Sequence, residues 1–211
     1  MDISKSKKLI VSAVAAVLGL AAMQANSATV SRAFAGNDCS GYFGQGFESC
    51  TIFVNDEGET IELSPVIAKF ESDEGLVLDD LNTALYPSVD GSEFSFSNTS
   101  AGNDSGDWAY APGVDDPGVR YWATKSGDGF LLTWEVADAD LEAGGVCDVA
   151  DVYVLGCLDA ALIQTSGSWA TEGQELSHIT FYDTAVIPVP AAFWLFGSAL
   201  GFLGWSRRKA R

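Results

Sequence analysis

His178, the only histidine in the chain, is the first candidate for catalysis, because a hydrolase needs a base beside a nucleophile. Ser177 precedes it, but adjacent residues of a β-strand point to opposite faces of the sheet, so we do not expect the two to form a pair. The chain contains no Gly-x-Ser-x-Gly nucleophile motif. Acidic residues are too numerous for any pair to stand out as a glycosidase dyad. We therefore predict no catalytic residues and a protein that is not an enzyme, with a secreted hydrolase as the least favoured alternative.

Four cysteines, Cys39, Cys50, Cys147 and Cys157, are the next candidates. An even number of cysteines in an exported chain indicates disulfides, and the sequence lacks the Cys-x-x-Cys pairs and histidines of a zinc site. Three pairings are possible. The short separations favour Cys39 with Cys50 and Cys147 with Cys157, since closing even a loop of about 15 residues removes roughly 3 kcal/mol of unfolded-state freedom.

Acidic turns raise the possibility of a structural calcium ion, because hard cations bind several oxygen ligands. The candidate ligand groups are Asn103, Asp104 and Asp107; Asp115 and Asp116; and Asp138, Asp140 and Glu142. None has the spacing of an EF-hand, and clustered aspartates more often form turns. We therefore predict no cofactor, keep calcium as an open alternative, and assign no metal ligands.

Tryptophans could serve a binding site or a hydrophobic core. Trp108 and Trp122 could form an exposed face on which a sugar stacks, with nearby Asp or Asn side chains binding its hydroxyls, as in a secreted lectin-like module. The more common use of such side chains in an all-β protein is core packing. Their exposure distinguishes the two interpretations.

Charge narrows the choice of partners. Residues 29–187 contain 28 acidic and 4 basic side chains, a net charge of −24. Such a surface repels phosphate backbones, so we exclude nucleic acid as a partner. Solubility is the simplest reason for this charge, followed by a saline habitat and by cation-dependent contacts in a matrix.

Short alternating or β-branched runs, bounded by Gly, Asn, Asp and Pro, predict strands along this region. The candidate strands are 51–54, 59–63, 66–71, 92–97, 119–124, 130–136, 152–155, 161–165 and 176–182. No long helical period interrupts them. We therefore expect an all-β fold, a jelly-roll-like β-sandwich over residues 29–185, with a signal helix before it and a membrane helix after it.

The N-terminal segment, residues 1–28, is typical of a secretory signal peptide. Three lysines precede an apolar run from Leu9 to Met23, and small residues follow at Ala25 and Ala28. We expect signal peptidase to cleave after one of these two alanines and the rest of the chain to be exported.

The C-terminal segment, residues 186–211, combines 21 uncharged residues with a basic end. Prolines at 188 and 190 leave 191–205 as uninterrupted helix, about 22 Å long at 1.5 Å per residue, which is marginal for a permanent membrane span. The basic end is expected to stay cytoplasmic, which places the preceding domain on the outer side. An ordinary single-span anchor is the alternative to a temporary one.

The last 25 residues read IPVPAAFWLFGSALGFLGWSRRKAR and closely resemble the PEP-CTERM sorting signal of exported Gram-negative proteins. Pro188 and Pro190 match the two prolines of the motif, and Val189 stands where the name-giving pattern has Glu. Arg207, Arg208 and Lys209 match its basic end. The stretches CSGYFGQGFESC and DDPGVRYWATKSGDGFLLTWEV also resemble a recurrent ectodomain type of that family, to which no catalytic activity is assigned.

The resemblance implies an exported protein with a defined route. The domain would be held transiently at the cytoplasmic membrane by its C-terminal helix and cut near the proline motif by an exosortase, a membrane-embedded protease. It would then remain in the cell envelope or the extracellular matrix, where exopolysaccharide is a possible partner.

Overall fold

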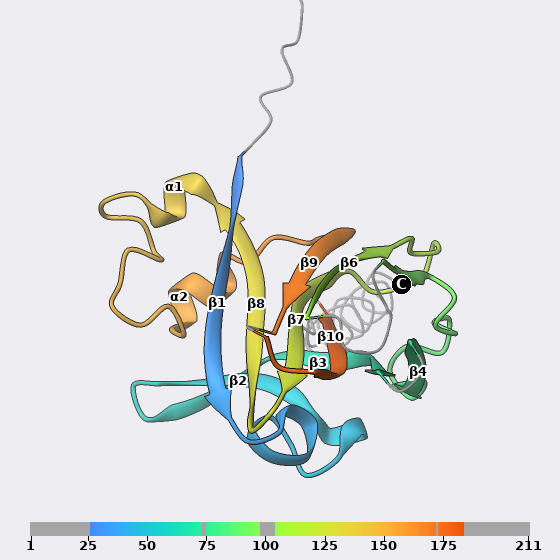
Figure 1. Ribbon diagram of the computed structural model, residues 1–211. Helices are drawn as coiled ribbons and strands as arrows, with labels where there is room; N and C mark the ends of the chain where they lie inside the picture. The colour runs from blue at the N-terminus through green and yellow to red at the C-terminus, as the bar shows by residue number, and fades with distance from the viewer. Residues whose placement is uncertain (1–25, 73–74, 98–103, 172, 184–211) are drawn as a thin grey trace, which may run out of the picture.

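The computed structural model describes residues 26–72, 75–97, 104–171 and 173–183 (Figure 1). Most of the predicted signal segment and the whole sorting motif, namely Pro188, Val189, Pro190, Arg207, Arg208 and Lys209, lie outside these residues. Within the described ranges every helix is too short or too polar to span a lipid bilayer.

The larger of two antiparallel sheets has seven strands. Its strands are β1 (Ser27–Ala35), β8 (Gly129–Ala137), β7 (Val119–Ser126), β10 (Leu176–Asp183), β3 (Glu59–Ser72) and β2 (Thr51–Asp56), in this spatial order, with β4 (Leu76–Leu81) also paired to β3. The smaller sheet has the order β5 (Phe94–Phe96), β6 (Ser105–Tyr110) and β9 (Ser166–Ala170). The protein is therefore all-β, as predicted.

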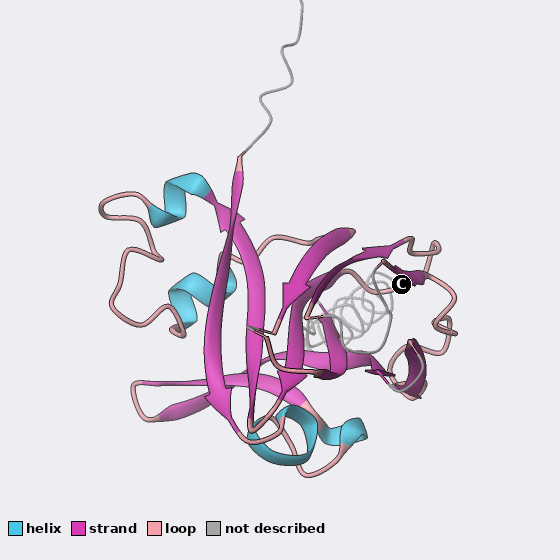
Figure 2. Cartoon of the chain, viewed as in Figure 1, coloured by secondary structure: helices cyan, strands magenta, loops and turns pink. Residues whose placement is uncertain are grey.

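In the part of the chain that the structure describes, helices are few and short (Figure 2). They are α1 (Asp138–Leu141), α2 (Leu155–Asp159) and two helical turns over Asp38–Tyr42 and Phe47–Ser49. Figure 1 looks along the large sheet, with α1 and α2 on one side of β1 and β8 and with β6 and β9 on the other. The large sheet is thus the middle layer of the molecule.

Both faces of this sheet are buried at its centre. On β7, Tyr121 and Ala123 belong to one hydrophobic cluster, and Trp122 between them belongs to a second. On β10, the neighbouring residues Phe181 and Tyr182 likewise belong to different clusters, Tyr182 to the first and Phe181 to the second. Successive strand residues point to opposite faces, so a central strand covered on both sides becomes a continuous apolar run. This explains why β3, β7, β8 and β10 were recognisable in the sequence.

β3 is one strand where two were expected, separated at Ser64 and Pro65. The Val66 amide donates to the Cys50 carbonyl beside β2 at 2.9 Å. Because backbone groups alternate in direction, the Pro65 nitrogen faces away from β2, and on that side the described pairing with β10 begins only at Val66. Proline therefore removes no described sheet hydrogen bond here.

Two predicted strands are wrong. Residues 152–155 form a bend that leads into α2, and residues 161–165 are irregular apart from one bridge between Gln164 and Val119. The apolar side chains of 152–155 and Ala161 pack on the cluster beneath α2 without a partner strand, whereas Ile163 is exposed. β1, β4, β6 and β9 were not predicted, and β1 begins at Ser27, inside the segment assigned to the signal peptide.

Candidate functional site

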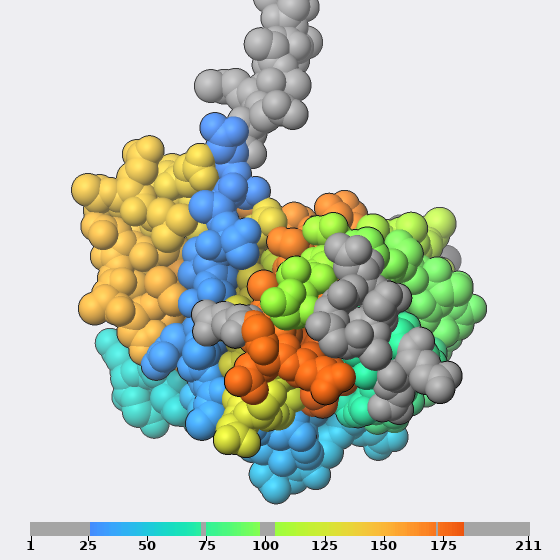
Figure 3. Space-filling model, viewed as in Figure 1, coloured from blue at the N-terminus to red at the C-terminus, as the bar shows by residue number. Residues whose placement is uncertain are grey.

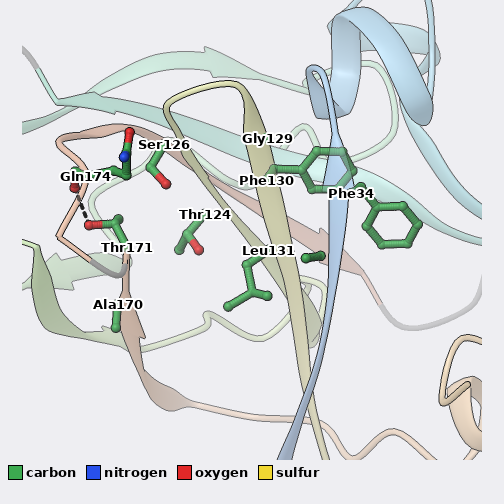
Figure 4. A pocket seen from close by; sticks show the side chains of 10 residues that line it. Phe34, Thr124, Ser126, Gly129, Phe130, Leu131, Ala170, Thr171 and Gln174 are labelled. Atoms are coloured by element: carbon green, nitrogen blue, oxygen red, sulfur yellow. Dashed lines mark hydrogen bonds between the residues drawn. The ribbon is translucent and has the colours of Figure 1, made fainter. Parts of the chain in front are cut away.

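A groove lies between the large sheet and β9. It consists of two pockets, of about 270 and 200 Å³, which adjoin at Thr124, Leu131 and Ala170. β8 and β1 provide its floor, because the small sheet covers the centre of the large sheet and not this end. Figure 4 shows Thr124 and Ser126 between Thr171 and Gln174 on one side and Leu131 on the other.

Strand register places the residues of the groove. Across three strands, Thr124 of β7 lies opposite Leu131 of β8, which lies opposite Ala33 of β1. The next row contains Thr133 opposite Ser31. Apart from Leu131, these side chains are small, so the floor stays hollow where larger residues would fill it.

Gly129 closes one end of the floor. A Cβ atom at this position would lie 2.6 Å from the Phe34 carbonyl oxygen, so only glycine allows the two strands to approach this closely.

The lining of the groove is uncharged and mixes hydroxyl groups with apolar side chains. None of the lining residues is Asp, Glu, Lys or Arg, although these types make up 19% of the chain. Thr124 and Thr133 are 2% and 5% exposed and have no side-chain hydrogen bond to another described residue. The Thr171 hydroxyl, by contrast, donates to the Gln174 carbonyl (Figure 4). The groove can hydrogen-bond an uncharged polar ligand, and its lining holds no acid–base pair.

A buried polar cluster lies elsewhere, on the face that carries the helical turns. His178 Nε2 is 2.9 Å from Asp38 Oδ1, and the Tyr182 hydroxyl donates to Asp38 Oδ2 at 3.2 Å. Asp38 and His178 are 1% and 3% exposed. Burial alone would raise the pKa of Asp38, but the hydrogen bond and charge of His178 outweigh it and lower that pKa to about 2. The carboxylate is therefore held ionised inside the protein.

This cluster fixes the first disulfide segment to the sheet. The Tyr182 hydroxyl lies 3.6 Å from both sulfur atoms of the Cys39–Cys50 disulfide. Burial, followed by the charge of Asp38, raises the pKa of Tyr182 well above its ordinary value. Tyr182 therefore stays protonated and donates to Asp38. A third pocket, of about 150 Å³, borders Asp38 from the solvent side, next to Lys69 and Asp80.

We expected the side chains of Ser177 and His178 to lie on opposite faces of the sheet without contact, and this prediction is wrong. Ser177 Oγ lies 3.4 Å from His178 Nδ1. The pairing of β10 with β7 shifts register between Leu176 and His178, and such a bulge changes the direction of a side chain. None of the three pockets described above is lined by either residue.

The predicted disulfides are confirmed: Cys39 is bonded to Cys50 and Cys147 to Cys157. Core packing, the favoured interpretation of the tryptophans, is confirmed, and the alternative of a sugar-stacking face formed by Trp108 and Trp122 is wrong. Trp108 and Trp122 are each 1% exposed and pack edge to face, with ring centroids 5.2 Å apart. No group of three or more Asp, Glu, His or Cys side chains converges as a metal site within the residues that the structure describes, and Asn103 lies outside them.

The groove was missed in the sequence analysis. One signal was available: Thr124 and Ser126 stand at alternate positions of β7, and Thr133 stands among apolar residues of β8. Such a polar row indicates a face that is only partly covered. What covers it could not be predicted, because β9 was not recognised as a strand.

No protein-family model, curated protein or solved structure matches the chain.

Proposed function

We propose that this chain is an exported protein of the cell envelope or extracellular matrix, sorted by a PEP-CTERM-like signal. The order of three elements in its last 25 residues carries the proposal: the Pro188-Val189-Pro190 motif, an uncharged stretch, and the basic end at Arg207, Arg208 and Lys209. An exosortase-type membrane protease then cuts near the prolines and releases the domain from its anchor. The role of the domain outside the cell is non-catalytic, with exopolysaccharide as its partner.

Two features of the domain support this proposal. Its two disulfides are consistent with an extracytoplasmic compartment. Its last strand, β10, ends at Asp183, so the described sheet pairings use no residue of the 186–211 tail. A cut near Pro188 would leave all of these pairings in place. We also propose that the two sheets form a jelly-roll-like sandwich over residues 29–185, because the second hydrophobic cluster lies between them.

Intact mass after fractionation tests the sorting proposal in a strain that contains an exosortase and in a matched strain that lacks one. We expect the first strain to release a chain that lacks both termini and weighs four hydrogens less than its reduced form. The second strain should keep a membrane-bound chain that ends at Arg211. A membrane-bound chain retaining Arg211 in both strains would establish a simple anchor and refute the proposal.

Two proline variants localise the signal. Replacing Pro188 and Pro190 with alanine should stop release. Replacing Pro87 and Pro112, two exposed prolines of the domain, should leave release unchanged. Equal release of both double variants would show that the protease does not recognise the proline motif.

The groove favours a second candidate function, the binding of an uncharged glycan. Its hydroxyl-rich and charge-free lining suits such a ligand on a domain that otherwise repels anions. We expect the exported protein to be retarded by a neutral glucan in affinity electrophoresis and not by an anionic polysaccharide. Thr124→Val together with Thr133→Val should abolish the retardation. Unchanged retardation of this double variant would exclude the groove.

A further inference from the structure

β1 is the one long edge of the large sheet that carries no acidic residue. Edge strands are usually protected from pairing by charge, proline, a bulge or short length. β4 carries Asp79 and Asp80, and β2 ends in Asp56. β1 has nine residues, no proline, and a register with β8 that is unbroken from Ser27 to Ala35. Its only charge is Arg32, which forms an ion pair with Asp151.

The outward backbone groups of β1 can be identified from its pairing with β8. The Gly36 amide donates to the Asp128 carbonyl, and the Asp138 amide donates to the Asn26 carbonyl. Residues of β1 with even numbers therefore bond to β8, and residues with odd numbers direct their amides and carbonyls away from the sheet. Among the described residues, the only partner of these outward groups is the Arg32 guanidinium, which donates to the Ala33 carbonyl at 3.4 Å.

This edge is accessible. Figure 3 shows β1 in blue as a strip that crosses the visible face of the molecule. The segment around Asp151 contacts the side chain of Arg32, on the face that carries the helical turns, and its described residues form no hydrogen bond with the β1 backbone.

We propose that β1 pairs with β1 of a second copy of this chain, antiparallel and with Ser31 on the two-fold axis. Signal-peptide cleavage after Ala25 keeps Ser27, and in that chain only this register uses all five outward residues: Ser31 faces Ser31, Thr29 faces Ala33, and Ser27 faces Ala35 of the second copy. The facing side chains are small and uncharged, so no like-charged pair is created directly across the new ladder. If one strand slides along the other by one pair in either direction, only four of the outward residues can pair. One of these two shifted registers also places Arg32 opposite Arg32 of the second copy.

The pairing would join two sheets into one and two grooves into one. The outward residues Thr29, Ser31 and Ala33 also line the groove floor, so the floor continues across the two-fold axis into the second copy.

The net charge of the chain predicts an unusual salt dependence of dimer formation. Each copy carries a net charge of −24 over residues 29–187, so repulsion opposes association, and added salt should strengthen the dimer by screening it.

Sedimentation velocity of the exported chain in a mild non-ionic detergent tests the proposal, at 0.15 and 1 M NaCl. We expect a reversible dimer that is tighter at 1 M NaCl. Ser31→Glu places two carboxylates across the axis and should weaken the dimer about fivefold. Ser31→Pro removes two hydrogen bonds at the axis and should weaken it on the order of tenfold or more, without removing a bond to β8.

Ser95→Glu is the matched control, because it adds the same charge at an exposed position of β5. It should leave the dimer unchanged. A chain that stays monomeric at both salt concentrations, or association that is equal in the Ser31 and Ser95 variants, would overturn the proposal, and the second result would assign association to another surface such as the apolar tail.

Cross-linking tests the register independently. In a hydrogen-bonded antiparallel pair, facing Cα atoms lie about 5.5 Å apart, within the range of a disulfide. Ser31→Cys should therefore give a covalent dimer on oxidation with diamide, and Thr29→Cys should not. The opposite result would refute the register. The sorting proposal is unaffected by either outcome, because it rests on the tail.

Discussion

The Asp38–His178 pair predicts a part of the folding free energy that depends on pH. The pKa of Asp38 falls from 3.8 to about 2 in the folded protein, because the hydrogen bond and charge of His178 outweigh the effect of burial. A lowered folded-state pKa means that the unfolded chain binds the proton more tightly. The stabilisation is therefore complete above pH 3.8 and is lost as the pH falls through about 2. At about 1.4 kcal/mol for each pKa unit, it amounts to about 2 kcal/mol.

Asp38→Asn isolates this contribution from those of the other carboxylates. The measurement is urea unfolding of the exported protein, with its disulfides intact, at several pH values between 2 and 5. Trp108, Trp122, Trp134 and Trp169 are buried and report unfolding by fluorescence. The difference in unfolding free energy between wild type and variant should be about 2 kcal/mol larger at pH 5 than at pH 2.

Asp56→Asn is the control, because it removes the same charge at an exposed position at the end of β2. Its difference from wild type should change little between pH 2 and pH 5. If the Asp38→Asn difference were also constant with pH, Asp38 would titrate alike in the folded and unfolded chain. The description of the pair as a stabilising contact would then be wrong.

Three further changes and one control variant test the packing through the unfolding free energy. Replacing Cys147 and Cys157 with alanine should lower it by about 3 kcal/mol in urea unfolding, because the bridge restricts the unfolded chain. Trp122→Ala should cost about 3 to 5 kcal/mol in the same assay, because this side chain is 1% exposed. Gly106→Ala should lower the melting temperature through a loss of about 1 to 3 kcal/mol, because its Cβ would lie 2.5 Å from a carbonyl oxygen. Gly41→Ala, whose Cβ would meet only an atom 3.5 Å away, should stay within about 0.5 kcal/mol.

The central strands could be predicted because burial on two faces leaves a continuous apolar run. The strands at the edges carry no such signal. β1 has few large apolar residues and begins inside the predicted signal segment, and β9 is five residues with two serines and a glycine. The wrongly predicted strand at 152–155 had an apolar run but no partner. Apolar runs report burial, and only the tertiary fold determines whether a neighbouring strand is present.

The cysteine pairing could be predicted from short separations, but the polar cluster beside it could not. Asp38 and His178 are 140 residues apart, and neither lies in a recognisable motif. The position of Ser177 depends on a bulge, which changes side-chain direction without a distinctive residue. The tryptophans were ambiguous for a different reason, since the same side chain serves a core and a binding face.

The two faces of the large sheet are covered by different means, and this difference explains where the disulfides lie. β5, β6 and β9 satisfy one another's backbone groups, so a regular sheet covers one face without a cross-link. The other face is covered by residues 36–50 and 138–161, which contain only short helical turns. Ordering such irregular segments costs conformational entropy with few repeating hydrogen bonds in return. Each of them contains one disulfide, and all four cysteines belong to the hydrophobic cluster on this face. By restricting the unfolded chain, the two bridges offset this entropy cost on the side of the sheet that lacks a regular cover.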